Sequence, residues 1–168
     1  SSLKEKNIPF YSQTDSEVIV NYIAYHYHTI IANNRTPISQ NTASISQHQK
    51  WIKEAIHNAL QGMEGTWGIV LISIRTPNTL YCFRHGSPLL ISYDNHYAYI
   101  ASEQSAFGDK VNNYITIDNH DICILSISKN SIRLESDIHY QANNISNLGD
   151  SSKEGYVHWM KRSEEHTF

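Results

Sequence analysis

The stretch that decides the fold is residues 49–74, QKWIKEAIHNALQGMEGTWGIVLISI. In its first half, apolar residues recur at the spacing of one helix face, which predicts an amphipathic helix from about residue 49 to residue 61. Those residues are Ile52, Ala55, Ile56, Ala59 and Leu60. Gly62 and Gly65 favour the end of this helix and the turn beyond it. Residues 67–74 are rich in β-branched side chains and predict a strand, so the helix passes directly into sheet.

Before this stretch, Thr14-Asp15-Ser16-Glu17 forms a capping box, in which the hydroxyl and the carboxylate satisfy donors at a helix start. The helix that follows is expected to bury one apolar stripe. Its members are Val18, Ile19, Tyr22, Ile23 and Tyr27. Residues 8–12 predict a short strand. Residues 29–47, which are rich in Ser, Thr and Asn around Pro37, predict a long surface loop or insertion.

After the stretch, most of the chain predicts short strands joined by turns. The expected strands are 79–83, 89–93, 97–101, 114–117, 122–127 and 132–134, with a short helix at 102–107 and a polar loop at 141–152. Asp94-Asn95-His96 is expected to be a hairpin turn between strands 89–93 and 97–101. Strands 114–117 and 122–127 are expected to pair across the turn Asp118-Asn119-His120. Two helices followed by hairpin-connected strands predict one layered α+β domain, without internal repeats or a linker.

Composition and net charge exclude several classes of function. The 168 residues are 40% apolar and 17% charged, which is typical of a globular domain. A net charge of −3 gives no electrostatic footprint for nucleic acid, and no apolar run approaches the roughly 18 residues of a membrane span. The first residues do not have the pattern of a signal peptide. The two cysteines, Cys82 and Cys123, lie in apolar runs and are interpreted as buried structural thiols of a cytoplasmic protein.

Few residues announce chemistry by themselves. His26 and His28 are two apart, which points them to different faces of a helix, and neither HExxH nor CxxC occurs, so no metal site and no cofactor is expected. Asp15 is the most suggestive residue, because it lies in the first turn of a helix just after a strand. Spacing alone leaves two interpretations open: a carboxylate that favours the helix dipole, or a fixed anion that holds the ammonium group of a ligand.

Five segments in order carry a family resemblance. They are residues 10–19 (FYSQTDSEVI), 60–68 (LQGMEGTWG), 84–91 (RHGSPLLI), 100–106 (IASEQSA) and 155–160 (GYVHWM). They resemble the F-x-S-x-T-D-T-E-V-I, L-x-G-x-Y/W-G, R-x-G-S-P-L-x-I, I-A-S-D-x-x-A and G-x-x-H-x-M segments of class II glutamine amidotransferases. The R-x-G-S-P-L form is similar to that of the glutamine–fructose-6-phosphate aminotransferases, which form glucosamine 6-phosphate.

The resemblance implies a four-layer αββα N-terminal-nucleophile hydrolase sandwich, of which residues 1–161 would be the later part, without its N-terminal strands. The catalytic cysteine and the oxyanion-hole residues of the family precede the T-D-T-E segment, so no catalytic residue is expected in this chain. Asp15 matches the Asp that contacts the α-amino group of bound L-glutamine. The resemblance also implies a sugar isomerase domain in the parent, a homo-oligomeric parent and a cytoplasmic location.

The chain departs from the family at Ser16 (Thr), Glu103 (Asp) and His120 (a turn Gly). Two alternatives stay open: another class II amidotransferase, similar to amidophosphoribosyltransferase, and a non-catalytic module of the same fold. The final residues 162–168, RSEEHTF, break from the family pattern, and RSEEHT is what a common sequencing-library adapter encodes in one frame. A non-native tail is therefore expected there, and a natural charged tail is the alternative.

Overall fold

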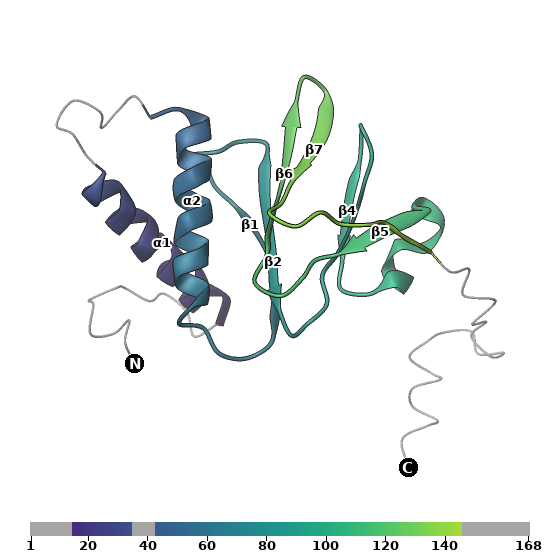
Figure 1. The fold of residues 1–168 in the computed structure, drawn as a ribbon, viewed down its shortest axis with the longest axis horizontal. Coiled ribbons are helices and arrows are strands. Elements are labelled where there is room, and N and C mark those ends of the chain that lie inside the picture. The colour runs from purple at the N-terminus through teal and green to yellow at the C-terminus, as the bar shows by residue number, and fades with distance from the viewer. Residues whose placement is uncertain (1–14, 35–42, 146–168) are drawn as a thin grey trace, which may run out of the picture.

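A computed structural model describes residues 15–34 and 43–145 of the chain (Figure 1). The helices are α1 (Asp15–Asn33) and α2 (Ile45–Leu60). The strands are β1 (Trp67–Ile72), β2 (Thr79–His85), β3 (Leu90–Tyr93), β4 (Ala98–Ala101), β5 (Asn113–Thr116), β6 (Ile122–Ser128), β7 (Ser131–Glu135) and β8 (Asn143–Asn144). A 3₁₀-helix, η2 (Gln104–Lys110), follows β4. The strand expected at 8–12, Thr14 of the capping box and the tail at 162–168 lie outside the described residues.

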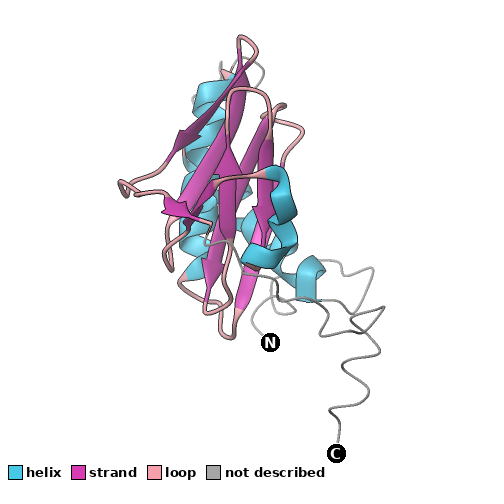
Figure 2. Ribbon diagram, turned by 90° about the vertical axis from the view of Figure 1, so that its right-hand side faces the viewer, coloured by secondary structure: helices cyan, strands magenta, loops and turns pink. Residues whose placement is uncertain are grey.

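The described elements form three layers in the order helices, sheet, sheet (Figures 1 and 2). The first sheet has strand order β1-β2-β6-β7 and the second β4-β3-β5-β8, and all of their strand pairs are antiparallel. One face of the first sheet packs on the helices through Tyr81, Phe83 and Ile124. Its other face packs on the second sheet, where Leu125 meets Ile91. The expected α+β class is confirmed at this level.

Helix α2 confirms the clearest sequence signal. All five apolar residues that predicted its inner face are buried. The helix begins four residues earlier than expected, because the Ser44 hydroxyl accepts a hydrogen bond of 3.1 Å from the Gln47 amide and caps it.

Helix α1 is longer than predicted, and one residue of its stripe is wrong. The predicted residues Ile19, Tyr22, Ile23 and Tyr27 pack in the core together with Ile30, whereas Val18 is 42% exposed. The loop expected at 29–47 is also wrong at both ends, which are helical. Two of its polar side chains donate hydrogen bonds to backbone carbonyls of α1 and do not end the helix. Thr29 Oγ1 donates to the Tyr25 carbonyl at 2.9 Å, and the Asn34 side chain donates to the Ile30 carbonyl at 2.8 Å.

The pairing expected between residues 114–117 and 122–127 is wrong. Strand β5 pairs with β3 and β8, whereas β6 pairs with β2 and β7 in the other sheet. The turn at Asp118-Asn119-His120 therefore carries the chain from one sheet to the other. Local turn chemistry, including a left-handed His120 at φ 68°, is the same for a hairpin and for this crossing, so the sequence pattern cannot separate them.

The remaining expectations are mostly confirmed. The hairpin at Asp94-Asn95-His96 joins β3 to β4, with the Asp94 carboxylate accepting from two backbone amides at 2.6 and 2.7 Å. The last expected strand is β7, and the short helix is η2. Strand β8 lies inside the segment that was predicted to be a loop. No helix of the described residues combines the length and the apolar character that crossing a membrane requires.

Candidate functional site

Asp15 is the first residue of α1, as the capping box predicts. Figure 1 shows this end of α1 beside the C-terminal end of α2, where α2 passes into β1. The two helix ends are held closely together, because a Cβ atom added at Gly62 would lie 2.7 Å from the Tyr22 hydroxyl. Packing against α2 thus fixes the course of α1, of which Asp15 is the first residue. The N-terminus of such a 19-residue helix carries a partial positive charge.

The R-x-G-S-P-L segment forms a corner, held by hydrogen bonds, where the chain leaves the first sheet at the end of β2. The Arg84 guanidinium donates to the Ile117 carbonyl through Nε, and through Nη1 to the carbonyls of Gly86 and Ser87 at 3.4 and 3.5 Å. The Gly86 amide donates to Asn119 Oδ1 at 3.0 Å. Arg84 therefore joins the two segments that cross between the sheets, and its donors are used on backbone carbonyls.

Three aromatic rings continue from this corner onto the helix side of the sheet. The His85 ring lies 4.8 Å from that of His120 and 5.8 Å from that of Trp67. Within the part of the chain that the structure describes, the buried atoms His85 Nδ1 and Trp67 Nε1 have no hydrogen-bond partner. His85 fills the unspecified position of the R-x-G-S-P-L segment, and His120 stands where the resembled family has a turn Gly.

Near this corner, the buried carboxylate of Asp121 accepts hydrogen bonds from two hydroxyl groups of the segment after β7. Asp121, which is 6% exposed, accepts from Ser136 Oγ at 2.7 Å and from Tyr140 OH at 2.6 Å. The Tyr140 oxygen in turn accepts from the Asp118 amide at 3.0 Å. Burial, followed by the hydrogen bond to Asp121, raises the pKa of Tyr140. This network fixes the path of the chain between β7 and β8 against the crossing turn.

The two cysteines are buried, as expected. Cys82 and Cys123 are directly opposite each other on β2 and β6, and neither side chain is accessible to solvent. Burial raises the pKa of the Cys82 thiol to about 12. Burial, reinforced by the nearby Asp121 carboxylate, raises the pKa of Cys123 to about 12 as well. Because the thiolate is the reactive form, neither cysteine is suited to be a nucleophile.

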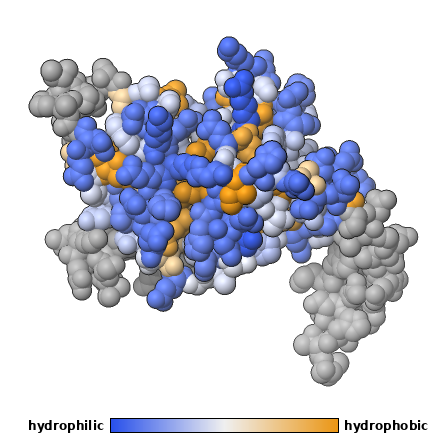
Figure 3. Space-filling model, viewed as in Figure 1, coloured by the Kyte–Doolittle hydropathy of each residue, from blue (hydrophilic) through white to orange (hydrophobic). Residues whose placement is uncertain are grey.

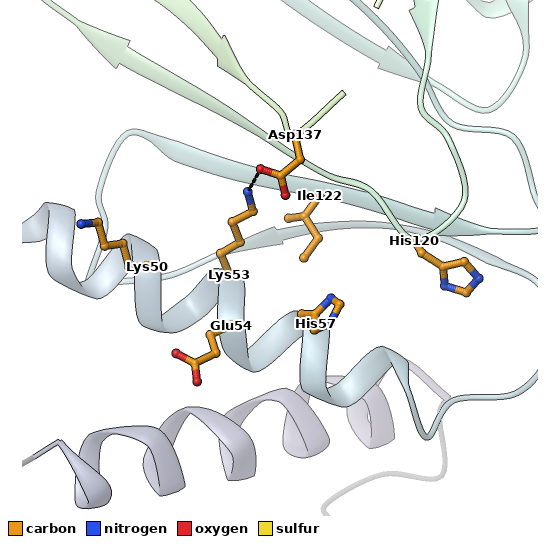
Figure 4. A pocket seen from close by; sticks show the side chains of 7 residues that line it. All are labelled: Lys50, Lys53, Glu54, His57, His120, Ile122 and Asp137. Carbon is orange, nitrogen blue, oxygen red and sulfur yellow. Dashed lines mark hydrogen bonds and ion pairs between the residues drawn. The ribbon is translucent and has the colours of Figure 1, made fainter. Parts of the chain in front are cut away.

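A shallow cleft of about 310 Å³ lies between α2, the start of β6 and the segment that follows β7 (Figure 4). Lys53 forms an ion pair of 2.7 Å with Asp137 (Figure 4), and Glu54 is also among the lining residues. His57 and His120 line the same cleft. Among the described residues, no three His, Cys, Asp or Glu side chains are arranged to hold a metal ion.

A substitution at Gly86 tests how much the close packing of this corner contributes to stability. Its φ is +72°, and an added Cβ would lie 2.5 Å from the Thr66 methyl carbon. We expect Gly86→Ala to lower the free energy of unfolding by about 3 kcal/mol, from backbone strain together with the clash. Gly65 is the matched control, because its φ is +96° and nothing lies within 4 Å of an added Cβ. Gly65→Ala should cost about 1 kcal/mol in the same denaturant titration, and equal losses would contradict the packing argument.

No protein-family model matches the chain. Individual proteins do match, along nearly the whole chain. A probable glutamine–fructose-6-phosphate aminotransferase (isomerizing) of Acanthamoeba polyphaga mimivirus is 27% identical over 95% of the chain. The enzymes of that name from Buchnera aphidicola and Methanocaldococcus jannaschii are 30% and 25% identical over 96% and 94% of it. The chain is a relative of the glutamine–fructose-6-phosphate aminotransferases.

The chain spans 23%, 14% and 24% of the length of the mimivirus, Methanocaldococcus and Buchnera relatives. The glutamine–fructose-6-phosphate aminotransferase resemblance singled out Asp15 and the R-x-G-S-P-L segment. The structure places Asp15 at the start of α1 and the segment at the corner where the chain leaves β2. It did not single out Asp121, Ser136 and Tyr140. No signal in the sequence could have found this network, because its partners lie 15 and 19 residues from Asp121 and belong to a loop.

Proposed function

We propose that the chain is the later part of the glutaminase domain of a glutamine–fructose-6-phosphate aminotransferase. The whole enzyme would hydrolyse L-glutamine and use the ammonia to convert fructose 6-phosphate into glucosamine 6-phosphate, for hexosamine synthesis. The observation that carries the proposal is the match to enzymes of this name over 94–96% of the chain in three distant organisms. The alternatives are another class II amidotransferase, similar to amidophosphoribosyltransferase, and a non-catalytic module of the same fold.

We also propose the finer fold, a four-layer αββα N-terminal-nucleophile hydrolase sandwich to which residues 1–161 contribute. Three successive layers, helices, sheet and sheet, support this proposal. In such a domain the N-terminal cysteine thiol attacks the side-chain amide of glutamine, with its own α-amine as the base. An amide side chain and a backbone N–H stabilise the oxyanion. These groups would come from polypeptide other than this chain, so no catalytic residue is assigned within it.

Asp15 is the residue of this chain that we assign to the substrate. A carboxylate at the start of α1 would hold the α-ammonium group of L-glutamine through a charge-assisted hydrogen bond. A sugar isomerase domain of a homo-oligomeric, cytoplasmic parent would receive the ammonia. We propose residues 162–168 to be foreign to this domain, and re-sequencing of the gene tests that boundary.

The first test uses the chain alone. We expect no ammonia release from L-glutamine, because the two described cysteines are buried thiols with a pKa of about 12. The measurement is a coupled assay for glutamate and ammonia, with Cys82→Ala and Cys123→Ala as companions. Glutamine hydrolysis that either substitution abolishes would make that cysteine a nucleophile and refute the assignment.

A further inference from the structure

The first turn of α2 is joined to α1 by a hydrogen bond between two half-buried side chains. The Tyr27 oxygen lies 2.7 Å from His48 Nδ1. The two residues are 21 apart in the sequence, and Figure 1 shows their helices side by side. The His48 ring also lies edge-on to the Trp51 ring of its own helix, with 5.4 Å between the ring centres. The imidazole is therefore held between an aromatic neighbour and a hydroxyl group of the other helix.

The surroundings of His48 oppose a positive charge on its ring. His48 is the fourth residue of α2, and the N-terminus of a helix carries a partial positive charge. Burial, and then the charge of Arg75, lower the pKa of His48 below its ordinary value. Burial also raises the pKa of Tyr27, so its hydroxyl keeps its proton. We infer that the Tyr27 hydroxyl donates to a neutral imidazole.

Three further titratable or charged side chains surround this pair, each from a different element. The His28 ring of α1 lies 5.7 Å from the Tyr27 ring, Arg75 belongs to the turn between β1 and β2, and Tyr81 of β2 interacts with Tyr27. Burial raises the pKa of Tyr81, which keeps that side chain neutral. None of these three side chains is acidic, so none of them offsets a positive charge on His48.

Helix α2 is held more firmly than α1 at this end of the helix pair. Its five inner residues are buried, and the Gln49 side chain donates to Thr79 Oγ1 of β2 at 3.1 Å. Figure 3 shows a largely hydrophilic surface over α2, whose apolar side is turned inward. On α1, Ile30 is buried beyond Tyr27, and the helix ends at Asn33. Loss of the hydrogen bond would therefore loosen the C-terminal half of α1 and leave α2 on the sheet.

We propose that the Tyr27–His48 hydrogen bond is a pH-sensitive contact, which holds the C-terminal half of α1 against α2 while His48 is neutral and weakens when the ring takes up a proton. Protonation turns Nδ1 from an acceptor into a donor, so the Tyr27 hydroxyl would have to reverse its role beside a new positive charge. Because the folded state favours the neutral ring, the stabilising effect is complete above about pH 6.5, the ordinary pKa of histidine, and decreases as the pH falls below it. The proposal concerns the described helices alone and does not rest on the proposed function.

Amide hydrogen exchange of the 168-residue chain at about pH 7.5 and about pH 5.5 tests the proposal on either side of the ordinary histidine pKa. Each rate is divided by that of an unstructured peptide at the same pH, because exchange itself depends on pH. We expect the amides of residues 27–34 to lose about five-fold of their protection at the lower pH, while those of residues 52–60 keep theirs. His48→Gln removes the titrating ring and should abolish this loss. His57→Gln, at an exposed histidine of the same helix, is the matched control and should retain it.

Tyr27→Phe removes the hydroxyl and keeps the aromatic ring, so it should lower the protection of residues 27–34 already at about pH 7.5. Unchanged protection in this variant would show that the hydrogen bond does not hold the helix and would overturn the proposal. A loss at low pH that persists in His48→Gln would assign it to another group, with the same consequence. Nuclear magnetic resonance of the His48 ring in the unsubstituted chain gives an independent test. The ring should take up its proton at a lower pH than histidines of the unfolded chain, and uptake at the same or a higher pH would refute the proposal.

Discussion

Asp15→Asn should raise the KM for L-glutamine about ten-fold or more in an enzyme that joins this segment to the nucleophile-bearing part. The substitution keeps the size of the side chain and leaves the predicted Thr14–Glu17 capping box in place, but it removes the charge. A hydrogen bond between a carboxylate and an ammonium group is worth about 1.5–3 kcal/mol, and about 1.4 kcal/mol corresponds to a factor of ten. The measurement is steady-state glutaminase kinetics at saturating fructose 6-phosphate.

The competing role for Asp15 makes a different prediction. A carboxylate that only favours the helix dipole contributes about 0.3–1 kcal/mol to stability and does not touch the substrate. In that case the melting temperature would fall slightly and the KM for glutamine would not move. Ser16→Ala is a useful control, because Ser16 is the next residue of α1 and is exposed. Ser16→Ala should change neither the KM for glutamine nor the melting temperature. An effect equal to that of Asp15→Asn would indicate a general disturbance of the helix start.

Periodicity predicted the parts of the fold whose causes are local. The inner face of α2 follows from the spacing of five apolar residues, and the β3–β4 hairpin follows from Asp94, whose carboxylate holds its own turn. Such features depend on neighbours within a few residues. They can therefore be read from the chain without knowledge of the rest of the molecule.

The sequence predictions are wrong where contacts between residues far apart in the chain determine the structure. The crossing at Asp118-Asn119-His120 reads as a hairpin turn, but Arg84, 33 residues from Ile117, ties the backbone before this turn to the other corner. The polar residues at the end of α1 read as a loop, but they hydrogen-bond to carbonyls of their own helix. Arg84 was recognised only as part of a family motif, because its structural role depends on carbonyls that only the folded chain brings to it. The site role of Asp15 stays a prediction, because it depends on a substrate and on polypeptide outside the chain.

Asp121→Ala should destabilise the fold strongly, since it removes the centre of a buried hydrogen-bond network. Asp121 is a buried carboxylate that accepts hydrogen bonds from the hydroxyls of Ser136 and Tyr140 and lies 3.6 Å from the Cys123 sulfur. Hydrogen bonds to a charged group contribute about 1.5–3 kcal/mol, so we expect the free energy of unfolding to fall by about 3 kcal/mol. Chemical denaturation followed by tryptophan fluorescence measures this loss.

Asp137 supplies the matched control, because it lies in the same segment and its charge is also paired. Its carboxylate forms the 2.7 Å ion pair with Lys53, but the side chain is 76% exposed, so Asp137→Ala should cost at most about 1 kcal/mol. Tyr140→Phe removes one donor to Asp121, together with the acceptor of the Asp118 amide, and should fall between the two. If the network acts as a unit, Asp121→Ala and Tyr140→Phe combined should destabilise by less than the sum of the single losses. Additive losses, or equal effects of Asp121→Ala and Asp137→Ala, would show that burial gives this carboxylate no special role in holding the chain between β7 and β8.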